Sequence, residues 1–141
     1  MAGRDTYLDQ LASIKLFSAL SRKELQRIAK ASDEVKVKAG HELVRQGEVG
    51  REMFVIVEGE ATVKRNGRKV ATLGPGGTVG EFSLLDKGPR TATVVADTDA
   101  TVLVLGAREF TGLLDDVPGL AHKVLAALAG VVRDLDAKVY G

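Results

Sequence analysis

Apolar residues at the start of the chain recur at the three- and four-residue spacing of amphipathic helices. The first such series contains Leu8, Leu11, Leu16 and Phe17. Asp5 or Thr6 can cap a helix that carries this series. Ser21 and Glu24 stand three residues apart in front of a second apolar series, which is the capping-box pattern. The sequence therefore predicts two short helices within residues 1–33, with their apolar faces packed against a barrel.

From about Glu34 the apolar period shortens to two, which is the period of β-strands. Asn66-Gly67 lies between two such runs and is a strong signal for a two-residue hairpin turn. The expected strand segments are 35–37, 43–44, 53–57, 61–64, 68–73, 91–96 and 101–105, with residues 62–65 leading into the hairpin turn. Many short strands with turns between them predict a mainly β fold, a double-sheet jelly-roll β-barrel over residues 34–106.

Helical spacing returns at about Arg108, and Pro118 separates a short helix from a longer one over about residues 119–139. The long helix has two apolar seams. The Leu125 seam contains Ala121, Leu125, Leu128, Val132, Leu135 and Val139. The Val124 seam contains Leu120, Val124, Ala127 and Val131. Docking against one surface needs only one seam, so the other is available for a partner or a bound ligand. Gly130, in the middle of this helix, predicts a close approach or a bend.

Composition limits the classes of function. A length of 141 residues suits one domain, in which helices 1–33, the barrel 34–106 and helices 107–141 combine. The net charge of +1 gives no bulk attraction to nucleic acid or to anionic membranes, so neither is expected as a partner. The absence of cysteine excludes disulfides, thiol catalysis and Cys-ligated metals. No apolar run has membrane-spanning length and the N-terminus is no signal peptide, so the default location is cytoplasmic.

The segment between Gly80 and Ala92 has the most specific chemistry in the chain. The planar guanidinium of Arg90 can pair with two oxygens of one phosphate. A short helical turn over residues 80–85 would direct backbone N–H groups at the same phosphate. Glu81 is an acceptor suited to a ribose hydroxyl, and the 2′-OH is the only free ribose hydroxyl of a 3′,5′-cyclic nucleotide. These groups together predict a site for a small anionic sugar phosphate.

This segment resembles the phosphate-binding cassette of cyclic nucleotide-binding domains. The cassette of that family runs Gly-Glu-apolar-small-Leu, a variable loop, and then Pro-Arg-(small or Thr)-Ala. The matching segments here are Gly80-Glu81-Phe82-Ser83-Leu84 and Pro89-Arg90-Thr91-Ala92. Residues 39–48 and 53–59 look like the first barrel strands and turns of the family, and the resemblance extends from about Leu16 to the last helix.

The resemblance implies a cyclic nucleotide sensor without catalysis. The ligand contacts that it implies are Gly80, Glu81, Phe82, Ser83, Arg90, Thr91 and Ala92. Arg90 would hold the phosphate, and Glu81 would hold the ribose 2′-OH or instead pair with Arg90 in the empty site. Gly80, Phe82, Ser83 and Ala92 would contribute mainly backbone groups. Thr91 permits cGMP without requiring it, and cAMP is favoured because it is the more frequent ligand.

In this family the C-terminal helix closes as a lid over the base. By position, the resemblance makes Arg133 and Tyr140 the candidate caps. A guanidinium can stack on a purine, although Arg133 is equally explained as a solvated residue on the polar face of the helix. The Leu125 seam is a candidate contact for a symmetric homodimer, and a downstream protein is a further candidate partner.

Three other classes of protein are alternatives to a cyclic nucleotide sensor. A cupin-type enzyme needs several histidines around a metal, and His41 and His122 cannot supply that cluster, so no metal, cofactor or catalytic residue is expected. A DNA-binding regulator would need a helix-turn-helix and a basic cluster after the last helix. The chain ends at Gly141 without them, which favours a protein partner or a regulatory fragment of a longer protein. A ligand-free dimerisation module is the remaining alternative.

Overall fold

The structure, a computed structural model, describes residues 4–140. The chain forms two compact units, with divisions after Lys30 and after Thr111. The strand unit comprises residues 31–111. The helical unit combines the chain before this stretch with the chain after it.

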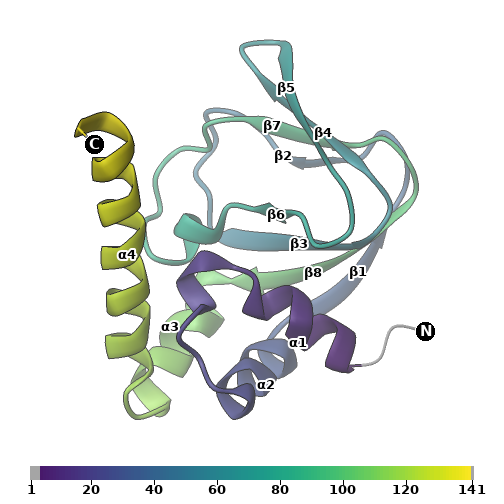
Figure 1. The fold of residues 1–141 in the computed structure, drawn as a ribbon. Helices are drawn as coiled ribbons and strands as arrows, with labels where there is room; N and C mark the ends of the chain where they lie inside the picture. The colour runs from purple at the N-terminus through teal and green to yellow at the C-terminus, as the bar shows by residue number, and fades with distance from the viewer. Residues whose placement is uncertain (1–3, 141) are drawn as a thin grey trace. The chain divides into compact units, whose positions relative to one another are not determined.

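Two antiparallel sheets of four strands face each other in the strand unit (Figure 1). The first sheet has the order β1 (Asp33–Val37), β8 (Ala100–Gly106), β3 (Glu52–Glu58) and β6 (Thr78–Val79). The second has the order β2 (Glu42–Val44), β7 (Thr93–Ala96), β4 (Ala61–Arg65) and β5 (Arg68–Leu73). This arrangement confirms the predicted jelly-roll architecture.

The core of the strand unit lies between these sheets. Its buried members are Val44, Phe54, Ile56, Ala61, Val79, Val94 and Val102. They come from strands of both sheets, and the alternating burial along β7 explains the period of two in the sequence. Burial of apolar side chains on facing sheets is the main source of stability for such a sandwich.

The predicted hairpin is present between β4 and β5. Asn66 has a φ of 53° and Gly67 a φ of 79°, so both central residues of the turn are left-handed. A type I′ turn requires this combination, and its twist matches that of the flanking strands. Arg65 therefore pairs directly with Arg68 across the turn.

Two strand predictions were incomplete. β6 was missed because Thr78–Val79 is too short to display a period, and its position depends on pairing with Phe54 and Val55 of β3. The strand expected from Thr91 begins only at Thr93. Arg90, the residue before Thr91, is hydrogen-bonded through its backbone to the loop before β3. This pairing keeps residues 91–92 out of β7.

The helical unit contains α1 (Arg4–Ala12), the 3₁₀ helix η1 (Lys15–Phe17), most of α2 (Arg22–Ala31), the end of α3 (Ala107–Asp116) and α4 (Leu120–Tyr140). The capping box of α2 is confirmed, because the Ser21 N–H donates to Glu24 Oε1 at 2.8 Å and the Glu24 N–H donates to Ser21 Oγ at 3.2 Å. Lys123 Nζ donates to the same Glu24 oxygen at 2.7 Å and joins α4 to α2. α1 is already formed at Arg4, one residue before the expected start.

The two seams of α4 differ in burial. Leu120 and Val124 of the Val124 seam are buried, whereas Leu125 and Val132 of the Leu125 seam are exposed. Gly130 has no close neighbour, since a Cβ there would meet no atom within 4 Å. Its mid-helix position is thus not explained by a close approach. Among the described residues, no helix combines the length and the apolar character needed to cross a membrane.

Candidate functional site

A cavity of about 460 Å³ opens in the strand unit. Its wall includes all the residues to which the cassette pattern assigned ligand contacts, namely Gly80, Glu81, Phe82, Ser83, Arg90, Thr91 and Ala92. Apolar side chains from both sheets complete it: Val44, Val63, Leu73, Val79 and Val94. The cavity therefore combines a polar wall from one segment of the chain with an apolar wall from the barrel.

The cassette begins with a glycine that the backbone requires. Gly80 has a φ of 73°, in the left-handed region, and initiates the 3₁₀ helix η2 (Glu81–Leu84). A Cβ at this position would also collide with Nη1 of Arg90. A side chain at position 80 would therefore displace the arginine that the cassette pattern assigns to the phosphate.

The turn at η2 uses several of its own backbone donors. The Ser83 N–H donates to the Gly80 carbonyl at 3.0 Å, and the N–H groups of Leu85 and Asp86 both donate to the Phe82 carbonyl. These three N–H groups are already paired within the turn. The turn was expected to offer free N–H groups to a phosphate, so a phosphate in the cavity would instead depend mainly on Arg90 for its hydrogen bonds.

Arg90 is half-buried, and its guanidinium contacts a hydroxyl and an aromatic ring. Its Nη1 donates to Ser83 Oγ at 3.1 Å, and its Cζ lies 5.9 Å from the centre of the Phe54 ring. A hydroxyl and an aromatic face both favour a cation without neutralising it. The hydroxyl of Ser83 therefore helps to position the Arg90 guanidinium.

Burial lowers the pKa of Arg90 below its ordinary value, and the charge of Glu52 offsets part of that effect. Arginine nevertheless remains protonated near neutral pH. The site thus contains a partly desolvated positive charge next to an open cavity. An anion that bound there would restore favourable electrostatics to the guanidinium.

Two charged residues of the cavity wall were not predicted from the sequence. Arg65, from the end of β4, lines the cavity, and its Nε donates to the Thr91 carbonyl at 3.2 Å. Asp86 lies in the variable loop of the cassette and also lines the cavity. No pattern in the sequence places Arg65 near the cassette, because the contact joins residues 26 positions apart.

The two candidate caps belong to α4, in the helical unit. The side chain of Arg133 is exposed, and a lid role for it stays a prediction. The side chain of Tyr140 lies outside the described part of the structure. Within the described residues, no group of three or more His, Cys, Asp or Glu side chains could hold a metal ion.

Comparison with known proteins decides the family. The sequence profile described as "Cyclic nucleotide-binding domain" matches residues 34–117. The chain belongs to the cyclic nucleotide-binding domain family. The matched region contains the complete cassette and all eight strands except the first residue of β1.

Two curated relatives illustrate the range of the family. A cyclic nucleotide-gated potassium channel of Rhizobium etli is 39% identical over 81% of this chain and 32% of its own length. A cAMP-dependent protein kinase regulatory subunit of Mucor circinelloides is 39% identical over 76% of this chain and 26% of its own length. The chain thus spans about a third or less of these relatives.

Solved structures give the same assignment. The N-terminal domain of a transcriptional regulator from Streptomyces coelicolor has a TM-score of 0.84 and 33% identity, covering 92% of this chain and 96% of that domain. The regulatory domain of Toxoplasma gondii PKA, crystallised with cAMP, has a TM-score of 0.71 and 30% identity. The match covers 77% of this chain and 43% of the Toxoplasma chain.

Proposed function

We propose that this protein is a regulatory module that binds cAMP and transmits the binding through its C-terminal helix. The observation that carries the proposal is the cavity in which Glu81 and Arg90 meet an apolar wall from the barrel. An anionic sugar phosphate with an attached base needs a cation, a hydroxyl acceptor and an apolar surface, and this cavity offers the three.

Each part of the ligand has an assigned partner. Arg90 binds the cyclic phosphate through charge-assisted hydrogen bonds, and Glu81 accepts the hydrogen bond of the ribose 2′-OH. The base lies against apolar side chains such as Val63 and Leu73, where its burial adds affinity. None of these contacts breaks a bond in the ligand, so the module acts as a sensor rather than an enzyme.

The choice of cAMP over cGMP is supported by relatives. One relative is named as cAMP-dependent, and one structural neighbour was crystallised with cAMP. Thr91 lines the cavity beside Arg90, so a guanine that reached its hydroxyl would also be accepted. Titration of the protein with both nucleotides decides the preference.

Signal transmission is proposed to depend on α4. A ligand shifts the position of this helix only to the extent that it makes contacts in one state that are missing in the other. Arg133 or Tyr140 would supply such contacts by covering the base, and the Leu125 seam would pair two copies of the chain or engage a downstream protein.

Removal of the Arg90 charge tests the proposal. Calorimetry with cAMP should show that Arg90→Ala loses about 2–4 kcal/mol of binding free energy, or roughly thirtyfold to a thousandfold in affinity. Arg68→Ala is the matched control, because Arg68 lies exposed in β5 and outside the cavity. It should bind cAMP as the unchanged protein does.

The alternative is a cyclic nucleotide-binding fold that has lost its ligand and serves only in pairing. In that case the unchanged protein would bind neither cAMP nor cGMP at micromolar concentration. Arg90 would then be a purely structural residue, and Arg90→Ala would lower the melting temperature of the free protein without any effect on nucleotide titrations.

A further inference from the structure

Gly50, in the loop between β2 and β3, lies directly against the side chain of Arg90. A Cβ on Gly50 would stand 2.7 Å from Arg90 Nε, 2.9 Å from Arg90 Cζ and 2.5 Å from Ser83 Oγ. Contacts this short force a neighbour to move. Gly50 does not have the left-handed φ that would by itself favour glycine. The need for glycine at this position is therefore steric, and the group that needs the space is the guanidinium.

The same loop fixes the backbone on both sides of Arg90. The Arg90 N–H donates to the Glu48 carbonyl at 2.7 Å, and the Arg90 carbonyl accepts from the Gly47 N–H at 2.9 Å. The Gly50 N–H donates to the Gly88 carbonyl at 3.0 Å. An isolated antiparallel bridge between the two segments completes this pairing. The loop thus sets where the Arg90 side chain begins, while Gly50 sets where its guanidinium can lie.

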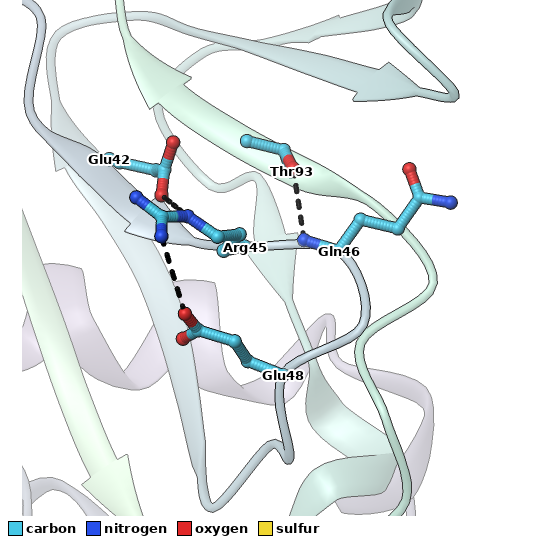
Figure 2. Close-up of polar contacts among 5 residues, drawn as sticks. All are labelled: Glu42, Arg45, Gln46, Glu48 and Thr93. Atoms are coloured by element: carbon cyan, nitrogen blue, oxygen red, sulfur yellow. Dashed lines mark hydrogen bonds and ion pairs between the residues drawn. The ribbon is translucent and has the colours of Figure 1, made fainter.

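The loop is itself anchored, as Figure 2 shows. Arg45 Nε donates to Glu42 Oε1 at 2.6 Å, and Arg45 Nη1 lies 3.6 Å from Glu48 Oε1. The Gln46 N–H donates to Thr93 Oγ1 at 2.9 Å and ties the loop to β7. The ion pairs are solvent-exposed and contribute little free energy of their own. The loop whose Glu48 carbonyl accepts from Arg90 is therefore tied to β7 through the Gln46 N–H.

From these contacts we infer that Gly50 is a positioning residue for the phosphate-binding arginine. Its missing side chain lets the β2–β3 loop close on Arg90, and Gly80 leaves space beside the same guanidinium from the cassette. The inference rests on the proposed function, because it concerns how Arg90 is presented to a cyclic phosphate. A methyl group at position 50 pushes the guanidinium away from the place where it meets the ligand.

The test is a double-mutant cycle on cAMP affinity, measured by calorimetry. Gly50→Ala should weaken cAMP binding about tenfold to a hundredfold, the range for a displaced hydrogen bond to a charged group. In the Arg90→Ala background the same substitution should have no further effect, because the Ser83 hydroxyl can rotate once the guanidinium is gone. Gly74→Ala is the matched control. A Cβ there meets no atom within 4 Å, and Gly74 has no left-handed φ.

Other outcomes overturn the inference. Equal losses from Gly50→Ala in both backgrounds would mean that Gly50 acts independently of Arg90, and no loss in the parent would mean that it has no positioning role. Any decrease of the melting temperature in Gly50→Ala should occur only when Arg90 is present. If Gly50→Ala lowers it by the same amount in the Arg90→Ala background, the inference is overturned. A parent protein that binds neither cAMP nor cGMP overturns both this inference and the proposed function. If the parent protein and Gly50→Ala bind cAMP with the same affinity, only the inference about Gly50 is overturned.

Discussion

Glu81 is the first residue of η2 and shares the cavity wall with Arg90. If its carboxylate accepts the hydrogen bond of the ribose 2′-OH, then 2′-deoxy-cAMP should bind the parent protein about tenfold or more weakly than cAMP, since a hydrogen bond to a charged group is lost. Glu81→Ala should bind the two ligands equally. Asp86→Ala removes another carboxylate of the same cavity and should keep the full discrimination. Full discrimination by Glu81→Ala would transfer the ribose contact to a different residue.

The N-terminus of α2 carries a pH-dependent contribution to stability. Glu24 accepts from Lys123 and from the Ser21 N–H, and these hydrogen bonds lower the pKa of its carboxyl below 4.5, the ordinary value, against a smaller opposing effect of burial. The folded protein thus holds the charged form more strongly than the unfolded chain does. The resulting stability is fully present above pH 4.5 and is lost as the pH falls through the lower, folded-state pKa.

Glu24→Ala measures this contribution. At pH 7 we expect it to cost about 1–2 kcal/mol of unfolding free energy, from the lost cap together with the lost ion pair. The difference from the parent protein should shrink as the pH is lowered below 4.5 during urea denaturation. A difference that stays constant down to pH 3 would show that charge plays no part. Lys123→Met, which leaves the cap intact, should reproduce only a fraction of the loss.

At the scale of the whole molecule, the Leu125 seam presents several exposed apolar side chains. Leu125, Val132, Leu135 and Val139 are 56% to 71% exposed. A helix face of this kind is typical of a pairing surface rather than of a solvated one. We expect sedimentation to show a dimer for the parent protein and a monomer for Leu125→Lys. The monomeric variant should remain folded, because Leu125 is exposed in the single chain. Ala126→Lys, on a neighbouring exposed face of α4, should leave the dimer intact. A monomeric parent protein would exclude the dimer.

The features that the sequence alone determined depend on neighbours within a few positions. Asn66-Gly67 fixes its hairpin because both residues tolerate a positive φ. Ser21 and Glu24 form their cap because three residues separate them. The period of two predicts a double-sheet fold because buried and exposed side chains alternate along a strand. The order of groups from Gly80 to Ala92 likewise predicts the cassette, since Arg90 and Glu81 lie in one short segment.

The features that only the tertiary structure decided join distant segments. Gly50 approaches Arg90 across 40 positions, Phe54 faces the same guanidinium, and Arg65 reaches the Thr91 carbonyl. None of these pairs has a spacing that a local pattern could reveal, because their contacts depend on how strands of two sheets align. The burial of one seam of α4 and the exposure of the other were equally undetermined, since both seams have the same helical period. Local preferences thus determine the elements and the chemistry of the cassette, whereas packing determines how its arginine is held.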